Sequence, residues 1–118
     1  MSVPASSPNK RLRLQTINSE DQILVRCSGR LTSEDSEMLR LEVGKLIPQT
    51  SRVVLDLTDL RYMDSSGLGA LVRVYVSCKT AGCDLQLINL NQRIKELLGL
   101  TNLLSVFSTA GQYYTRFP

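Results

Sequence analysis

The residues best suited to chemistry form one short run, Asp64-Ser65-Ser66-Gly67, which follows one apolar stretch and precedes another. A serine hydroxyl at such a bend can accept a backbone N–H and cap the helix that follows. The same hydroxyl can also receive a phosphoryl group. A phosphoserine adds about −1.5 to −2 charges near neutral pH, and the N-terminus of a helix tolerates that charge. The run therefore predicts either a structural cap or a modification site at Ser65.

Two glycines, Gly67 and Gly69, follow the serines at the start of a predicted helix. A glycine inside a helix costs about 0.5–1 kcal/mol relative to alanine. Two such costs indicate that something approaches the backbone closely here, either a neighbouring strand and loop or a partner protein. A phosphate at this place would repel an acidic or apolar partner surface, and Asp64 adds negative charge beside it. We therefore expect a site that switches binding while the fold survives.

The absence of histidine restricts the possible chemistry. The 118-residue chain has no His, so a Ser-His-Asp triad, a Cys-His pair and a histidine metal site are all excluded. Cys27, Cys78 and Cys83 fit neither a zinc nor a redox spacing. We interpret them as small apolar residues in a reducing cytoplasm, with a reactive Cys83 as the alternative. These features favour a binding protein over an enzyme, and no cofactor or metal is expected.

The charge pattern bears on the choice of partners. The formal charge of +3 is a weak excess, the basic residues are scattered, and Trp is absent. Nucleic-acid binders usually carry a denser basic stripe with aromatic residues in it, so we expect no direct contact with nucleic acid. No apolar run approaches the ~18 residues of a membrane span, and the N-terminus lacks the apolar core of a secretory signal. We expect a cytoplasmic protein that does not contact the membrane.

Hydrophobic periodicity predicts the elements that position the serines. Residues 1–9, rich in Ser, Pro and Asn, are expected to be a disordered tail, and residues 10–118 a single domain. Strands are predicted at 11–17 and 22–29, which form an antiparallel hairpin, and at 52–57, 84–90 and 103–107. Helices are predicted after Thr32, from Leu68 to Gly82, and over 91–99. The order β-β-α-β-α-β-α-β predicts an α/β fold with a mixed, mainly parallel sheet packed with helices.

Several local details follow from the same patterns. Thr32 or Ser33 is expected to cap the first helix, and Asn91 the third. The acidic residues near the start of the first helix, Asp35 among them, are expected to serve its dipole and solubility. Residues 58–63 are predicted to form a loop, and Asp56 to make a hydrogen bond at the strand end.

The run VVLDLTDLRYMDSSGLGALVRVY, residues 53–75, resembles the signature of the anti-sigma factor antagonists of the STAS domain family. The resemblance covers about residues 10–107 and implies a STAS-type fold. It also implies a bacterial partner switch, in which the unmodified protein binds an anti-sigma factor that is a serine kinase, and a sigma factor is released. The kinase would phosphorylate Ser65, with Ser66 as the second choice, and a serine phosphatase would reset the protein.

The resemblance also implies which residues contact the partner. These are Asp64, Ser65, Ser66, Gly67, Leu68 and Gly69, together with Arg30 and Thr32 before the first helix. The chain departs from the family at Gly29-Arg30-Leu31-Thr32, where the family commonly has Gly-Glu-Leu-Asp. The identity of the partner is therefore open, and the sequence does not settle the oligomeric state. A STAS scaffold, or a subunit of a larger assembly that is not phosphorylated, is the alternative function.

Two other classes of protein fit the sequence less well. Asp56 could be the acceptor of an aspartyl-phosphate receiver, but the chain lacks the acidic pair after the first strand and the late lysine that such a receiver needs. Gly67-Leu68-Gly69 could begin a dinucleotide-binding loop, but Val72 stands where the third glycine belongs. The sequence also has no Gly-Lys-Ser/Thr pair, so no motif supports nucleotide binding.

Overall fold

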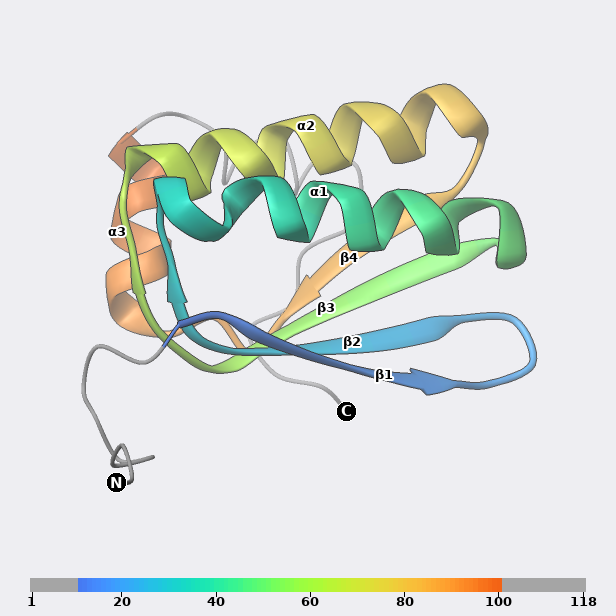
Figure 1. Ribbon diagram of the computed structural model, residues 1–118, viewed down its shortest axis with the longest axis horizontal. Helices are drawn as coiled ribbons and strands as arrows, with labels where there is room; N and C mark the ends of the chain where they lie inside the picture. Colours follow the sequence, from blue (N-terminus) through green and yellow to red (C-terminus); the bar gives the residue numbers. More distant parts are fainter. Residues whose placement is uncertain (1–10, 101–118) are drawn as a thin grey trace.

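A four-stranded sheet in the order β1-β2-β3-β4 forms the centre of the molecule (Figure 1). The computed structural model describes residues 11–100, with side chains as far as Leu97. Its elements are β1 (Arg13–Asn18), β2 (Ile23–Leu31), α1 (Ser33–Leu46), the short 3₁₀ helix η1 (Ile47–Gln49), β3 (Arg52–Met63), α2 (Ser65–Ala81), β4 (Asp84–Ile88) and α3 (Gln92–Leu100). The predicted tail at 1–9 and the predicted strand at 103–107 lie outside the described residues.

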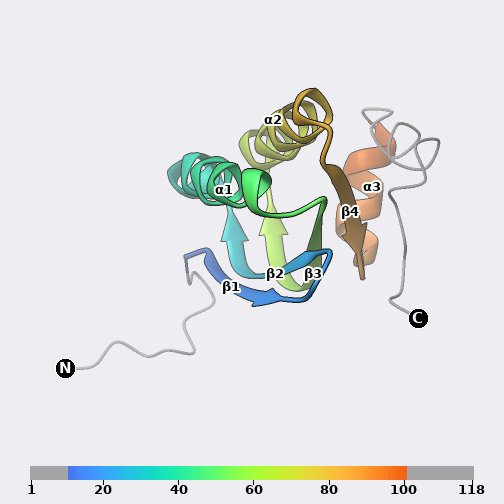
Figure 2. The same cartoon turned by 90° about the vertical axis from the view of Figure 1, so that its right-hand side faces the viewer.

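The pairing of the strands confirms the α/β class. β1 runs antiparallel to β2, whereas β2, β3 and β4 are parallel. Figure 2 shows α1 and α2 side by side across one face of the sheet, and α3 on the β4 side of the molecule. The alternating pattern of β2 places Ile23, Val25 and Cys27 in the core, and the continuous apolar pattern of β3 buries all of residues 53–57. The hairpin and the central strand are thus as predicted.

β3 is longer than predicted, because it continues through residues 58–63 that we expected to form a loop. This second half pairs with the end of β2, with Leu60 opposite Gly29 and Met63 opposite Leu31. Two register shifts give β3 an extra residue at each of two positions, and such bulges bend a strand. Burial of Leu60 and Met63 holds the bent half of β3 in place. The bend carries the chain up to the start of α2 (Figure 1).

The end of α2 follows the expected pattern. Gly82 has a φ of 75°, and its N–H and that of Cys83 bond to the carbonyl oxygens of Lys79 and Cys78 at 3.2 and 2.8 Å. This is the Schellman arrangement, in which the residues at the positions of Cys78 and Cys83 form an apolar contact. Both cysteines and Cys27 are buried and free.

Burial also makes the thiols unreactive. It raises the pKa of Cys27 and Cys78 to about 12, and it raises the pKa of Cys83 as well. The thiolate is the nucleophilic form, so a raised pKa disfavours reaction. The structure therefore supports the small, apolar role and not the reactive Cys83.

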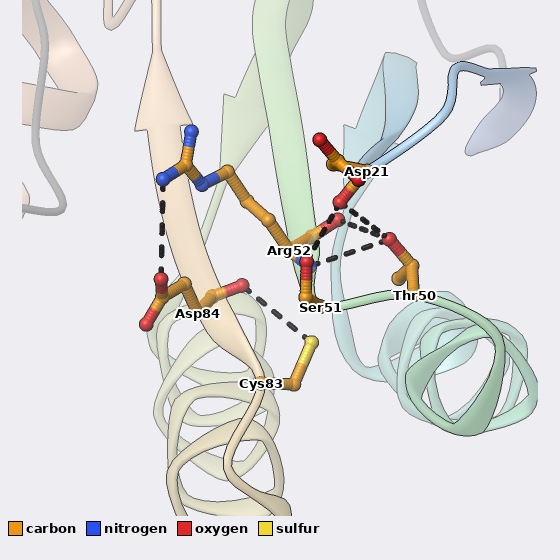
Figure 3. A network of polar contacts seen from close by, with 6 residues as sticks. All are labelled: Asp21, Thr50, Ser51, Arg52, Cys83 and Asp84. Atoms are coloured by element: carbon orange, nitrogen blue, oxygen red, sulfur yellow. Dashed lines mark hydrogen bonds and ion pairs between the residues drawn. The ribbon is translucent and has the colours of Figure 1, made fainter.

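A network of polar contacts lies at the end of the sheet where β3 and β4 begin, which is the end away from the start of α2 (Figure 3). The hydroxyl groups of Thr50 and Ser51 donate to the carbonyl oxygen of Asp21, at 3.0 and 2.9 Å. Arg52 forms an ion pair with Asp84 at 4.0 Å. The network joins the β1–β2 turn to the start of β3, and this role is structural.

The described part of the chain has neither a helix that could span a membrane nor a cluster of metal-binding side chains. Over residues 11–100, none of the helices has the length and apolar character that crossing a membrane requires. In the same range, no group of His, Cys, Asp and Glu side chains gathers in a way that could hold a metal ion.

Candidate functional site

Asp64 caps α2, and Ser65 is the first residue of the helix. The backbone of Asp64 is extended, with φ −111° and ψ −169°, and its Oδ1 accepts the N–H of Gly67 at 3.1 Å. Its carbonyl oxygen accepts the N–H of Leu68 at 3.0 Å. We expected Ser65 at or next to the cap, and it lies next to it. The interpretation of Ser65 as the capping side chain is wrong, because the aspartate provides that bond.

The two serines lie exposed on the first turn of α2. Within the described residues, neither the Ser65 nor the Ser66 hydroxyl forms a hydrogen bond. Because Asp64 caps the helix, the fold does not depend on either hydroxyl. The serines are therefore accessible to another molecule without any rearrangement of α2.

Gly67 explains one of the two glycines of the motif. A Cβ added there would lie 2.3 Å from the carbonyl oxygen of Leu31 and 2.8 Å from Cγ of Met63. The neighbouring strand thus approaches the backbone closely, which was one of the two causes that we predicted. Gly69 differs, because a Cβ there would meet no atom within 4 Å. The described residues give no packing reason for glycine at position 69.

Leu68 does not belong to the exposed surface. Only 8% of its surface is accessible, and it packs in the core with Leu71 and Val74. Its contact with a partner stays a prediction, and little of its side chain is accessible for one. Its role is to attach the first turn of α2 to the core.

The chain before α1 lies beside the start of α2. The N–H of Asp64 points to the carbonyl oxygen of Leu31 at 3.4 Å, and this residue separates Arg30 from Thr32. Thr32 occupies the cap position of α1, but its side chain makes no capping bond. Its carbonyl oxygen instead accepts the N–H groups of Asp35 and Ser36, so the expected side-chain cap is wrong. The two segments named by the sequence are nevertheless brought together.

Asp35 is a buried anchor and not a solvated charge. Its Oδ1 accepts the Nε and Nη2 groups of Arg11 at 3.0 and 2.5 Å, and its Oδ2 accepts the N–H of Leu12 at 3.2 Å. The hydrogen bonds from Arg11 lower the pKa of Asp35 against the opposing effect of burial. The expectation that this residue serves dipole and solubility is therefore corrected. Its partners precede it by 24 and 23 residues, and no local pattern reveals such a contact.

Asp56 lies within β3 and not at the strand end that we expected, because β3 continues to Met63, but it does make hydrogen bonds. Its Oδ1 accepts the N–H and Oγ1 of Thr58 at 3.0 and 2.5 Å, and Nδ2 of Asn89 at 3.1 Å. Burial opposes ionisation, but the hydrogen bonds from Thr58 and Asn89 outweigh it and lower the pKa of Asp56. This carboxylate joins the loop after β4 to β3, which is a structural role.

Sequence reasoning named Arg30 but missed the two residues that gather with it, Tyr62 and Arg93. Tyr62 lies under two guanidinium groups, with Cζ of Arg30 at 5.0 Å and Cζ of Arg93 at 5.9 Å from the ring centroid. Asn91 caps α3 as predicted, with its Oδ1 2.9 Å from the N–H of Ile94. Its Nδ2 also donates to the carbonyl oxygen of Leu60 at 2.9 Å, so the same side chain attaches α3 to β3.

Comparison with known proteins places this geometry in context. Residues 13–115 match the model of the STAS domain. The anti-sigma F factor antagonist of Paenibacillus polymyxa is 29% identical over 97 residues, which are 80% of this chain and 83% of that protein. The anti-sigma-B factor antagonist of Bacillus subtilis is 30% identical over 94 residues, which are 80% of this chain and 86% of that protein. The structure of the Bacillus cell fate determinant SpoIIAA in the phosphorylated form superposes with a TM-score of 0.64 at 18% identity, over 80% of this chain and 86% of the other.

Proposed function

This chain belongs to the STAS domain family, and on that premise we propose that it is an anti-sigma factor antagonist whose binding ends when Ser65 is phosphorylated. The two relatives that are 29% and 30% identical to this chain are named as anti-sigma factor antagonists. In this proposal the chain is a regulatory binding protein in the bacterial cytoplasm. Its partners are an anti-sigma factor that is a serine kinase, and a serine phosphatase.

One observation carries the proposal: the side chain that caps α2 and the side chain that would be modified are different residues. Asp64 makes the capping bond to Gly67, and Ser65 lies exposed beside it. A phosphoryl group on Ser65 therefore removes no hydrogen bond of the described structure. The N–H groups of the first helical turn have no partner within the helix, and the helix dipole favours an anion there.

The surface that a partner would cover is small and has little side-chain bulk. Ser65 and Ser66 are exposed, and Gly69 leaves room for a partner's backbone to come close to α2. Thr32 borders this surface from the start of α1, because Leu31 lies against Asp64. A phosphate at Ser65 would place a dianion in the middle of the contact. Like charges, or a desolvated charge, at an interface cost several kcal/mol, and each 1.4 kcal/mol is about a tenfold loss of affinity.

Binding measurements on three variants test this function. The tagged chain is first recovered from its native cells with its partner, and the partner is identified by mass spectrometry. Calorimetry with the purified anti-sigma factor then compares wild type, Ser65→Ala and Ser65→Asp. We expect Ser65→Ala to bind within about threefold of wild type, and Ser65→Asp to bind at least about tenfold more weakly.

Ser77→Asp is the matched control, because Ser77 is also exposed on α2 but lies 12 residues further along the helix. At about 1.5 Å per residue it is ~18 Å from Ser65, so the same charge should have little effect there. Equal affinities for Ser65→Ala and Ser65→Asp would contradict the switch. Recovery of a larger assembly without a kinase, with Ser65 unmodified, would favour the scaffold alternative.

A further inference from the structure

A basic and aromatic cluster lies on the surface near the serines. It consists of Arg30 on β2, Tyr62 on β3 and Arg93 on α3, and we call it the arginine–tyrosine cluster. Both guanidinium groups lie within the roughly 6 Å at which a cation over an aromatic ring is attracted to it. Tyr62 is 37% exposed, so the cluster is open to solvent and to a partner.

The strand register limits how far this cluster can lie from Ser65. Arg30 is paired with Tyr62, and the next pair, Leu31 and Met63, is buried below the start of α2. Tyr62 precedes Ser65 by three residues, which is about 10 Å of extended chain at ~3.3 Å per residue. Since side chains alternate along a strand, the cluster faces away from Met63 and toward the α3 side. A partner that covers the first turn of α2 has to extend only past the strand end to reach it.

The third member of the cluster is held in place by the cap of its helix. Arg93 lies two residues after Asn91, whose side chain bonds both to Ile94 and to the carbonyl oxygen of Leu60. The first turn of α3 is thereby attached to β3, two residues before Tyr62. Figure 1 shows α3 at the end of the sheet where β3 runs into α2. Three separate elements therefore place their side chains at this one end.

The chemistry of the cluster is suited to carboxylates. A guanidinium group that stacks on an aromatic face keeps its N–H donors at its edge, and these match the two oxygens of a carboxylate. Arg93 is exposed and forms no ion pair with any residue in the described range. The Tyr62 ring gives both arginines a cation–π contact on the same surface.

We propose that the arginine–tyrosine cluster recognises acidic side chains of the anti-sigma factor, and so forms the charge-selective part of the docking surface beside Ser65. The inference rests on the proposed function, because it names the chemistry of the partner that docks there. It also explains why a phosphate would be effective. A partner surface that carries carboxylates for Arg30 and Arg93 is the kind of surface that a phosphoserine three residues after Tyr62 repels.

Charge reversal within the cluster tests the inference. The purified anti-sigma factor recovered with the chain is titrated by calorimetry into wild type, Arg30→Glu and Arg93→Glu, at low and at moderate salt. We expect each reversal to weaken binding at least about tenfold, and the loss to be smaller at moderate salt because screening reduces the charge term. A glutamate at position 93 lies in the first turn of α3, where the helix dipole favours it, so the fold should persist.

Lys79→Glu is the matched control, since Lys79 is exposed in the last turn of α2, far from the cluster, and the change in net charge is the same. We expect it to bind within about threefold of wild type. Arg93→Gln serves as the milder variant and should give an intermediate loss.

The outcomes separate the two proposals. If both reversals bind like Lys79→Glu while Ser65→Asp still binds weakly, the cluster does not recognise the partner and the inference is wrong, but the proposed function stands. If the reversals change the affinity for the anti-sigma factor only when Ser65 is phosphorylated, the arginines interact with the phosphoserine and not with the partner, and the inference is again wrong. If wild type does not bind the anti-sigma factor at all, the proposed function itself fails.

Discussion

Replacement of Gly67 by alanine should destabilise the protein, although alanine is the better helix residue. The added Cβ would lie 2.3 Å from the carbonyl oxygen of Leu31 and 2.9 Å from its Cγ. The nearest atom belongs to a paired strand backbone and cannot rotate away. Overpacking of this kind costs about 1–3 kcal/mol, or more when backbone must shift, and the helix gains only about 0.5–1 kcal/mol from alanine. We expect a net loss of roughly 1–2 kcal/mol.

Gly69→Ala is the matched control, because it makes the same change two residues later in the same helix. A Cβ there meets nothing within 4 Å, so only the gain in helix propensity remains. We expect Gly69→Ala to be about 0.5–1 kcal/mol more stable than wild type. Urea denaturation followed by circular dichroism gives the free energy of unfolding of both variants. In thermal denaturation, a difference of 1 kcal/mol corresponds to a shift in melting temperature of ~4 °C. The reasoning is refuted if Gly67→Ala is as stable as Gly69→Ala.

The remaining predictions concern the cap, the ion pair between exposed Arg11 and buried Asp35, and the thiols. Asp64→Ala should lose about 1 kcal/mol in the free energy of unfolding, and Ser65→Ala should lose almost none, because only the aspartate makes the capping bond. If the serine were the cap, denaturation would show the larger loss for Ser65→Ala and almost none for Asp64→Ala. The hydrogen bonds from Arg11 lower the pKa of Asp35 in the folded protein. Ionised Asp35 therefore stabilises the fold at pH values above the unfolded pKa of about 3.9. That stabilisation is lost as the pH falls through the lower pKa of the folded state. The stability difference between wild type and Asp35→Asn should therefore shrink as the pH falls below about 4, and a constant difference would contradict the assignment. The three thiols should react with a disulfide reagent only after denaturation, since burial raises the pKa of each; fast reaction of the native protein would contradict this.

The features that the sequence predicted correctly are those that depend on neighbouring residues. The alternation of Ile23, Val25 and Cys27 requires one buried face, whatever the rest of the fold may be. Gly82 ends α2 because the chain needs a positive φ there, and Asn91 caps α3 through a bond to a residue three positions later. Local chemistry is sufficient for all of these.

The features that it did not predict depend on residues that are distant along the chain. Residues 58–63 are rich in polar side chains and become a strand only because the end of β2 lies beside them. The choice between Asp64 and Ser65 as the cap has the same origin. Both side chains can cap a helix. The contact of Asp64 with Leu31 and the tight fit of Gly67 against that residue set where α2 begins. A shift of one residue would move Gly67 out of that fit.

Asp64 caps α2 and leaves the Ser65 hydroxyl exposed, which has a consequence for the enzyme that would modify the protein. The Ser65 hydroxyl lies on the first turn of a 17-residue helix that is attached to the core through Leu68. It is therefore presented on a rigid element and not on an extended segment. A kinase with a cleft for extended peptides would find no such segment here, whereas a kinase that docks on the folded surface would find its acceptor already oriented. We expect a short synthetic peptide of residues 60–72 to be a poor substrate compared with the folded chain. In this way the fold itself would act as the recognition element, and substrate selection would need no consensus sequence around the serine.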